Sequence, residues 1–175
     1  MPEPVAAPER AHPRRVLLAA VAAAVLALDQ LTKWWALEHL SNGRVVEVVG
    51  TLRLRLTFNT GMAFSLAGGF APWIAVVALA VVVFLIWQGR SVATRSGAVA
   101  LGLVLGGALG NLADRAFRGD GGFFDGAVVD FIDLQWWPVF NVADMGVVVG
   151  GVLLVVSSLL GDHQTSAGRT DGAGG

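Results

Sequence analysis

Four long apolar stretches divide the chain, and most of its charged residues lie between or outside them. The stretches cover residues 16–37, 71–87, 97–113 and 140–160. A helix needs about 20 residues to cross ~30 Å of hydrocarbon. Each stretch reaches that length only when its polar end is counted, so we expect the polar ends to be helical too. The pattern predicts an all-α polytopic membrane protein with four transmembrane helices.

A different pattern lies between the first two stretches. In residues 51–59, leucine and phenylalanine alternate with Arg53, Arg55 and Thr57. A period of two predicts a half-buried strand. Residues 45–49, on the other side of Gly50, are its expected hairpin partner. We expect this small β-sheet to lie outside the membrane between the first and second helices, followed by a short amphipathic turn at residues 61–66.

The arginines predict the orientation of the chain. Arg14 and Arg15 precede the first helix, and Arg90 and Arg95 lie between the second and third. Positive residues beside spans mark the cytoplasmic side. Both clusters lie on that side if the N-terminus and the C-terminus are cytoplasmic. Arginines in the outer loops weaken this asymmetry without reversing it. Tryptophans gather at the predicted outer interface, as interfacial belts favour; they are Trp34, Trp35, Trp73, Trp136 and Trp137.

The first stretch has an alternative reading as a cleaved signal peptide, with Arg14 and Arg15 as its basic start. Three further stretches follow it, and it ends in Asp-Gln-Leu-Thr-Lys rather than in small residues, so we favour a retained helix. Residues 1–13 are rich in proline, and residues 161–175 are rich in glycine. We expect two disordered cytoplasmic ends around a single domain at residues 14–160.

Composition agrees with a membrane protein and excludes several kinds of chemistry. The 175 residues are 55% hydrophobic and 14% charged, whereas soluble domains have about 25% charged residues. A net charge of −1 argues against a nucleic-acid partner. The chain has no cysteine, and its three histidines lie far apart. We therefore expect no disulfide, no metal site and no cofactor.

Glycines recur at four-residue spacing in two of the stretches. The third contains Gly102, Gly106 and Gly110, and the fourth contains Gly146 and Gly150. Such spacing lets two helices approach closely. We expect a tight interface shared by these helices; the alternative is that the glycines face lipid.

Polar side chains gather at the outer ends of three of the predicted helices. An ionisable group at the bilayer centre costs at least ~3 kcal/mol, so such groups usually mark function. The group comprises Asp29, Lys33, Asn111, Asp114, Arg115, Asp130, Asp133, Asn141 and Asp144. The alternatives are snorkelling charges and pairs that only stabilise packing. We interpret Asp29 and Lys33, at i and i+4, as a structural pair, and Asp144, with no basic neighbour within a turn, as functional.

Carboxylates are the side chains that remain as candidates for catalysis. The chain has no cysteine nucleophile, no clustered histidine and no Gly-x-Ser-x-Gly motif, and we expect Asp29 to occupy its single lysine. Two aspartates held close together share one proton. One can then deprotonate water while the other polarises a carbonyl, which is aspartyl proteolysis. The residues alone leave five candidates open: Asp29, Asp114, Asp130, Asp133 and Asp144.

Five sequence blocks carry a family resemblance, in order along the chain. They are Asp29-Gln-Leu-Thr-Lys33, Asn59-Thr-Gly-Met-Ala-Phe64, Gly110-Asn-Leu-Ala-Asp-Arg115, Val128-Val-Asp-Phe-Ile132 and Phe140-Asn-Val-Ala-Asp144. With these blocks the chain resembles lipoprotein signal peptidase (signal peptidase II) over residues 14–160. That family cleaves bacterial prolipoproteins on the amino side of a diacylglyceryl-modified cysteine. The resemblance implies a lipidated prolipoprotein as substrate, membrane lipid as surroundings and a monomer in the bacterial inner (cytoplasmic) membrane, with the active site on the extracytoplasmic face.

The resemblance also implies a role for each matching residue. Asp130 and Asp144 would be the catalytic dyad. The residues expected to position the substrate and the dyad are Asn59, Asn111, Arg115 and Asn141; those expected to support the site are Asp29, Lys33 and Asp114. The sheet and residues 61–66 look like the family's cradle and substrate-clamping segment.

Three features depart from the family pattern or stand beside it. Residues 131–143 look shorter than in some relatives, and we expect residues 118–126 to form a flexible stretch that gates access. We expect Asp130 and Asp133 to lie in the loop that leads to the fourth helix. Asp133 adds a carboxylate near Asp130, and we interpret it as a solvated loop residue. The rival to a peptidase is a proton-coupled transporter or a non-catalytic assembly factor. A transporter needs polar residues across the full membrane, and the inner halves of the stretches carry no charge.

Overall fold

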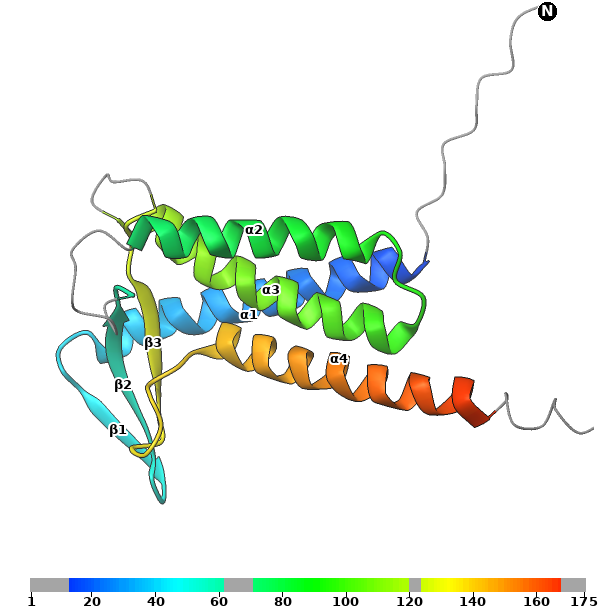
Figure 1. Ribbon diagram of the computed structural model, residues 1–175. Coiled ribbons are helices and arrows are strands. Elements are labelled where there is room, and N and C mark those ends of the chain that lie inside the picture. The colour runs from blue at the N-terminus through cyan, green and yellow to red at the C-terminus, as the bar shows by residue number, and fades with distance from the viewer. Residues whose placement is uncertain (1–12, 62–70, 120–123, 168–175) are drawn as a thin grey trace, which may run out of the picture.

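The computed structural model describes residues 13–61, 71–119 and 124–167, and within them four helices form a bundle with a three-stranded sheet at one end (Figure 1). In chain order the elements are α1 (Pro13–Leu40), β1 (Val45–Val49), β2 (Leu52–Asn59), α2 (Ala71–Gly89), α3 (Arg95–Phe117), β3 (Val128–Asp133) and α4 (Val142–Ala167). The four predicted stretches are helical and most of their polar ends belong to the helices, but α4 begins at Val142, so Phe140 and Asn141 of the fourth stretch lie just before it. The predicted turn at residues 61–66 lies outside the described residues except for Gly61.

Two of the helices are long and apolar enough to cross a membrane by length and composition, namely α1 and α3. The apolar stretches found in the described parts of α2 and α4 are shorter, Val76–Gly89 and Val142–Ser157. The count of four spans therefore stays a prediction. With 28 residues, α1 is about 42 Å long at 1.5 Å per residue, so it exceeds the hydrocarbon thickness and reaches the sheet.

The outer surface of the bundle is apolar. On α4, Val148, Val152 and Val155 lie on one helix face and are 57–63% exposed. Val77, Val83 and Phe84 of α2 are at least half exposed as well. A continuous exposed apolar surface of this kind suits contact with lipid rather than with water.

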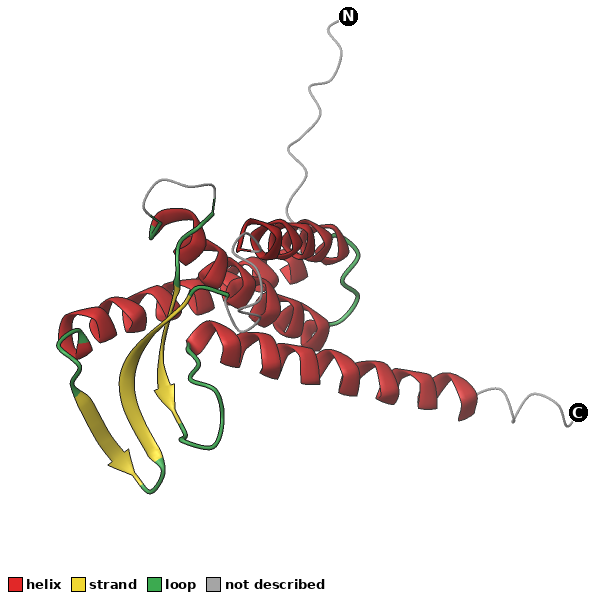
Figure 2. Ribbon diagram, turned by 60° about the vertical axis from the view of Figure 1, so that its left-hand side comes forward, coloured by secondary structure: helices red, strands yellow, loops and turns green. Residues whose placement is uncertain are grey.

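Arginines lie at one end of the bundle, and the sheet lies at the other. At the end away from the sheet, the Arg15 guanidinium donates to the Arg90 carbonyl oxygen at 2.8 Å. The arginines in the first turn of α1 therefore lie beside the connection between α2 and α3, at one end of the bundle. Figure 2 shows the sheet at the opposite end, next to the start of α4.

Helix α3 packs against both α1 and α4, and glycines allow the approach. A Cβ on Gly106 would lie 2.6 Å from the Ala22 carbonyl oxygen of α1, and one on Gly107 would collide with the Ala143 carbonyl oxygen of α4. Gly146 and Gly150 of α4 face α3. The predicted interface between the third and fourth helices is thus correct for α4, whereas Gly102 and Gly106 pack against α1 instead. Gly107, one residue beyond the four-residue spacing, meets α4 most closely, and Gly110 faces both Asp29 of α1 and Ala143 of α4.

The sheet has the order β1-β2-β3, and both pairs are antiparallel. The predicted hairpin is confirmed, with Val45 opposite Arg55 and Gly50 in its turn at a φ of 57°. The prediction of a sheet formed only between the first two helices is wrong, because β3 follows α3. Residues 128–133 were expected to be loop. They show no alternation because β3 is almost wholly buried, and a strand buried on both faces loses the period of two.

Candidate active site

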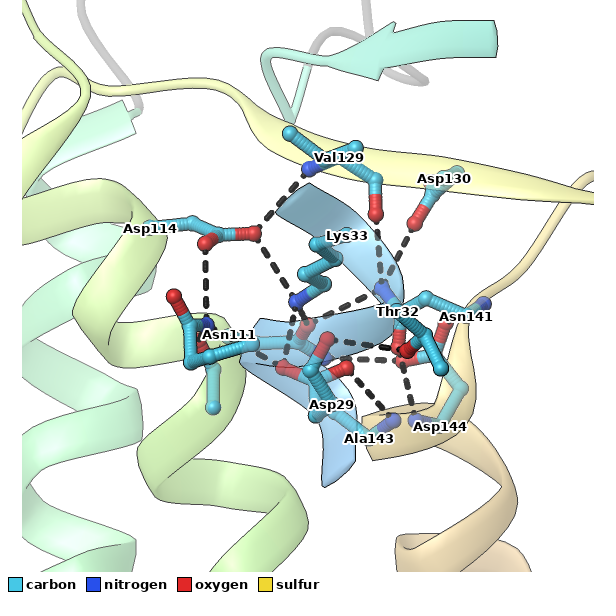
Figure 3. Close-up of polar contacts among 12 residues, drawn as sticks. Asp29, Thr32, Lys33, Asn111, Asp114, Val129, Asp130, Asn141, Ala143 and Asp144 are labelled. Atoms are coloured by element: carbon cyan, nitrogen blue, oxygen red, sulfur yellow. Dashed lines mark hydrogen bonds and ion pairs between the residues drawn. The ribbon is translucent and has the colours of Figure 1, made fainter. Parts of the chain in front are cut away.

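The polar residues gather where the sheet meets the helix ends, as Figure 3 shows. Lys33 of α1 is at the centre of this group and is fully buried. Its Nζ lies 2.8 Å from Asp29 Oδ2, 2.8 Å from Asp114 Oδ2 and 3.0 Å from Asn111 Oδ1. The ammonium thus has three oxygen partners for its three protons, which offsets the cost of burying a charge.

The two aspartates bound to Lys33 each hold a different element in place. Asp29 Oδ1 accepts a hydrogen bond from the Ala143 N–H at 2.9 Å, in the first turn of α4. Asp114 Oδ2 accepts one from the Val129 N–H at 3.1 Å, in β3. Lys33 and its partners therefore join α1 and α3 to the two elements that carry Asp144 and Asp130.

Asp144 is held by the first turn of its own helix. Asn141 Oδ1 accepts from the Asp144 N–H at 3.0 Å, and Asp144 Oδ2 accepts from the Asn141 N–H at 3.2 Å. This reciprocal pair is a capping box, which satisfies the free N–H groups at a helix start. Asn111 Nδ2 donates to the other oxygen, Asp144 Oδ1, at 2.8 Å. The partial positive charge of the helix start complements this carboxylate.

Asp130 lies in the middle of β3 and is 2% exposed. Asn141 Nδ2 donates to Asp130 Oδ1 at 2.7 Å, and the Asn59 side chain hydrogen-bonds to the same carboxyl group. Burial, reinforced by the negative charge of Asp144, raises the pKa of Asp130 from 3.8 to about 6. Asn141 thus contacts both carboxyl groups, one of which takes up a proton at a much higher pH than an ordinary aspartate.

A cavity of about 280 Å³ opens onto both carboxyl groups, and it is lined by Asn59, Ala78, Val81, Ala108, Asn111, Arg115, Val128, Asp130 and Asp144. Arg115 is only 7% exposed, and its Nη1 is the buried side-chain nitrogen in the described part of the chain that has no hydrogen-bond partner. A donor in that state is available to an acceptor that enters the cavity. Among the described residues, no three His, Asp or Glu side chains converge as a metal ligand set.

A second hollow, of about 430 Å³, is also lined by Asp144. Apolar side chains from α4 and the segment before it line it: Leu134, Trp136, Trp137, Phe140, Met145, Val148 and Val149. Trp136 and Trp137 are 70% and 59% exposed. Asp144 therefore lines both the cavity that it shares with Asp130 and this apolar groove.

Residues 21–160 match the family described as Signal peptidase (SPase) II. The chain belongs to the signal peptidase II family. It is therefore a peptidase by membership, and the resemblance drawn from the five blocks is confirmed.

Individual members of the family are similar to this chain over most of their length. A lipoprotein signal peptidase of Rhodococcus jostii (strain RHA1) is 48% identical over 161 residues, covering 91% of this chain and 78% of the relative. That of Mycobacterium avium (strain 104) is 48% identical over 165 residues, covering 93% of this chain and 90% of the relative. A solved structure described as a bacterial membrane enzyme, at 1.9 Å resolution, shares the fold with a TM-score of 0.71 and 27% identity, covering 81% of this chain and 92% of the other. Signal peptidase II membership thus rests on the whole four-helix domain.

The structure brings the predicted site residues together, while their individual roles stay predictions. Seven of them form one hydrogen-bonded network, namely Asp29, Lys33, Asn111, Asp114, Asp130, Asn141 and Asp144. Asn59 and Arg115 line the cavity beside it. The expected Asp29–Lys33 pair is present, and Asp114 shares the same lysine.

Two results differ from the sequence analysis. Asp133 is not a solvated loop residue: it is 2% exposed on β3 and pairs with Arg53 and Arg55. Gln30 was missed, although its Nε2 donates to Asp114 Oδ1 at 3.1 Å and to the Gly110 carbonyl oxygen at 3.2 Å. Nothing in the local pattern separates Gln30 from an ordinary polar residue, because these two partners lie 80 or more residues away.

Proposed function

We propose that the protein is a membrane-embedded aspartyl endopeptidase that removes the signal peptide from diacylglyceryl-modified bacterial prolipoproteins. It cleaves on the amino side of the lipidated cysteine with water activated between Asp130 and Asp144. One observation carries the proposal: two carboxyl groups share Asn141 and one cavity, and one of them has its pKa raised to about 6. Carboxyl groups in unlike environments divide the work of acid and base.

The environments favour one division of roles. Asp144, at the helix start, acts as the base that takes a proton from water, and protonated Asp130 donates to the scissile carbonyl oxygen. Water adds to the carbonyl carbon to give a tetrahedral diol. The diol collapses as the peptide C–N bond breaks: Asp144 gives the proton it took from water to the leaving nitrogen, and a diol hydroxyl returns a proton to Asp130. The products are the carboxylate end of the signal peptide and the free amine of the lipidated cysteine.

Two side chains of the cavity are placed to hold the substrate. Arg115 has a buried Nη1 without a partner, so it is suited to bind a substrate carbonyl oxygen. Asn59 Oδ1 accepts from the Gly61 N–H at 3.0 Å, which directs the amide nitrogen of Asn59 toward Asp130. Preorganised donors of this kind cost no rearrangement at the moment of reaction.

The groove beside Asp144 supports a lipid-modified substrate. It is apolar, its tryptophans are exposed, and it ends at the proposed base. A diacylglyceryl group in this groove would bring the adjoining peptide bond to the dyad. Confinement of both substrate and enzyme to the membrane then supplies much of the positioning.

The proposal includes a location and a topology. We place the four helices across the inner membrane with both termini in the cytoplasm and the sheet outside, supported by the Arg15–Arg90 contact at the opposite end from the dyad. All the residues of the dyad and its supporting network come from one chain, which is consistent with a monomer.

The direct test is cleavage of a diacylglyceryl-modified prolipoprotein by the purified protein in lipid nanodiscs, followed by gel mobility and mass spectrometry. We expect a new amino terminus at the lipidated cysteine. The same precursor without the lipid is the matched control and should remain uncut. An intact band from a substrate shown to be diacylated would refute the proposal.

A further inference from the structure

The β2–β3 pair carries site residues at one end and an ion cluster at the other. Near the dyad, Asn59 lies opposite Val128 and Thr57 lies opposite Asp130. At the far end, Arg53 lies opposite Asp133. The relative alignment of these two strands therefore decides whether the Asn59 side chain reaches the Asp130 carboxyl group.

The alignment changes by one residue along the pair. Leu54 lies opposite Ile132, but the next paired residue is Thr57, opposite Asp130. Two residues of β2, Arg55 and Leu56, therefore face the single residue Phe131, which is a β-bulge. If β2 continued from Arg53 without the bulge, Leu56 would lie opposite Asp130 and Asn59 would move past Val128. A one-residue slip turns each side chain to the other face of the strand.

Asp133 binds the strand on the side of the bulge away from the dyad. Asp133 Oδ2 accepts from Arg53 Nε at 2.8 Å and from Arg55 Nε at 2.6 Å, and Asp133 Oδ1 accepts from the Gln135 N–H at 2.7 Å. Arg55 is the first residue of the bulge. The Asp133 carboxyl group is 3% exposed, while the arginine side chains are 33% and 40% exposed.

β3 is fixed independently of this cluster. The Val129 N–H donates to the Asp114 carboxylate, and Asn141 Nδ2 donates to the Asp130 carboxyl group. Ile132 also pairs with Phe140 in a β-bridge. β2 is held less firmly: its outer neighbour is the exposed β1, and, among the described residues, its contact with α1 is the apolar packing of Leu54 and Leu56, which carries no polar group that specifies the alignment.

We propose that Asp133 is a positioning residue: by binding Arg53 and Arg55 it fixes the bulge that places Asn59 beside Asp130. The inference rests on the proposed dyad. Hydrogen bonding to Arg55 and Arg53 holds the pKa of Asp133 well below its usual range. The Asp133 carboxylate therefore stays charged at every pH of the assay.

The first experiment measures Asp133→Asn in nanodiscs across pH 5 to 8, normalised to folded protein. The free energy of a hydrogen bond to a charged group corresponds to a factor of roughly 10 to 100; we expect kcat to fall by such a factor and KM to change less than kcat. Glu47→Gln is the matched control, because Glu47 is exposed and lies opposite Arg53 on β1. It removes the same charge without touching β3 and should leave activity at the wild-type level.

The pH profile separates positioning from simple stability. The charged and polar groups acting on Asp130 are Lys33 of α1, Asn59 of β2, Arg115 of α3, and Asn141 and Asp144 at the start of α4. The Asn59 bond lowers the pKa of Asp130, so its loss moves the fall of kcat/KM to higher pH. If Asp133→Asn only lowers the fraction of folded protein and leaves the pH profile of kcat/KM unchanged, the proposal is overturned. A wild-type kcat in this variant would overturn it as well. In a double-mutant cycle, Asp133→Asn should cost little further activity once Asn59→Ala is present; additive losses would also overturn it.

A disulfide between the two strands, which can be reduced and reformed, tests the proposal without depending on whether Asp133→Asn folds. The chain has no cysteine, and directly opposed residues lie within disulfide range. Arg53→Cys with Asp133→Cys should be active when oxidised and at least about 10-fold less active when reduced. Equal activity in both forms would overturn the proposal. A wild-type protein inactive on diacylated precursor would instead refute the proposed function itself.

Discussion

Asp130→Asn is the substitution that tests the proposed chemistry most sharply, because it should lower the rate of cleavage and at the same time raise the stability of the folded protein. The side chain keeps its shape and its acceptor for Asn141 but loses the acidic proton. Loss of a general acid lowers kcat by about 10²–10⁴. We therefore expect cleavage of the diacylated precursor to fall near background in a protein that remains folded.

The same substitution should stabilise the protein at neutral pH. A pKa of about 6 in the folded protein, against 3.8 for an isolated aspartate, corresponds to about 3 kcal/mol against the ionised form. Because the folded pKa is raised, the stabilisation from the bound proton is fully present below pH 3.8 and is lost as the pH rises through about 6. A permanently neutral side chain avoids that loss. The variant should gain up to about 3 kcal/mol over wild type at pH 8 and almost nothing at pH 3.5.

Thermal unfolding of wild type and variant in one detergent, at pH 8 and at the lowest pH both tolerate, measures this difference. Asp144→Asn is the matched comparison. It should also abolish cleavage, but its amide has one oxygen in place of the two that accept from Asn111 and from the Asn141 N–H, so one hydrogen bond is lost at a cost of about 0.5–1.5 kcal/mol. Retained cleavage in Asp130→Asn, or a stability gain that does not grow with pH, would refute the reasoning.

Three further predictions address the pH dependence, the buried lysine and the helix packing. For the wild-type enzyme, kcat/KM should fall as the pH rises through about 6, because Asp130 must carry its proton; a flat profile from pH 5 to 8 would contradict this. Lys33→Met leaves two buried carboxylates without their cation and should cost about 3–5 kcal/mol; wild-type melting with lost cleavage would instead place Lys33 in the chemistry. Gly107→Ala should cost about 1–3 kcal/mol, because its Cβ would collide with α4, whereas Gly151→Ala meets nothing within 4 Å and is the control; equal melting temperatures would show that α3 and α4 adjust without cost.

Local features of the sequence were sufficient for the helices and the hairpin. Apolar length identified four helical segments, and the alternation around Arg53 and Arg55 identified β2. These inferences succeed because each depends on residues within about one turn or one strand of each other. The proposed dyad came from the resemblance to a family, since the residues alone left five aspartates open.

Strand β3 and the role of Asp133 could not be read from the sequence. A strand buried on both faces has no alternation, so residues 128–133 looked like loop and Asp133 like a solvated carboxylate. Its partner Arg53 lies 80 residues away along the chain. No local pattern reports a contact at that separation.

The sequence by itself thus determined that the chain belongs in lipid, where its helices lie, and that its carboxylates gather at one end. The tertiary structure decided what surrounds each carboxylate. Asp29 and Asp114 share the buried Lys33 and hold α4 and β3, Asp133 binds two arginines, and Asp130 is buried beside Asp144. The physical reason is that hydrophobic periodicity is a local property, whereas the charge state of a carboxyl group depends on the burial and the partner charges that distant segments bring to it.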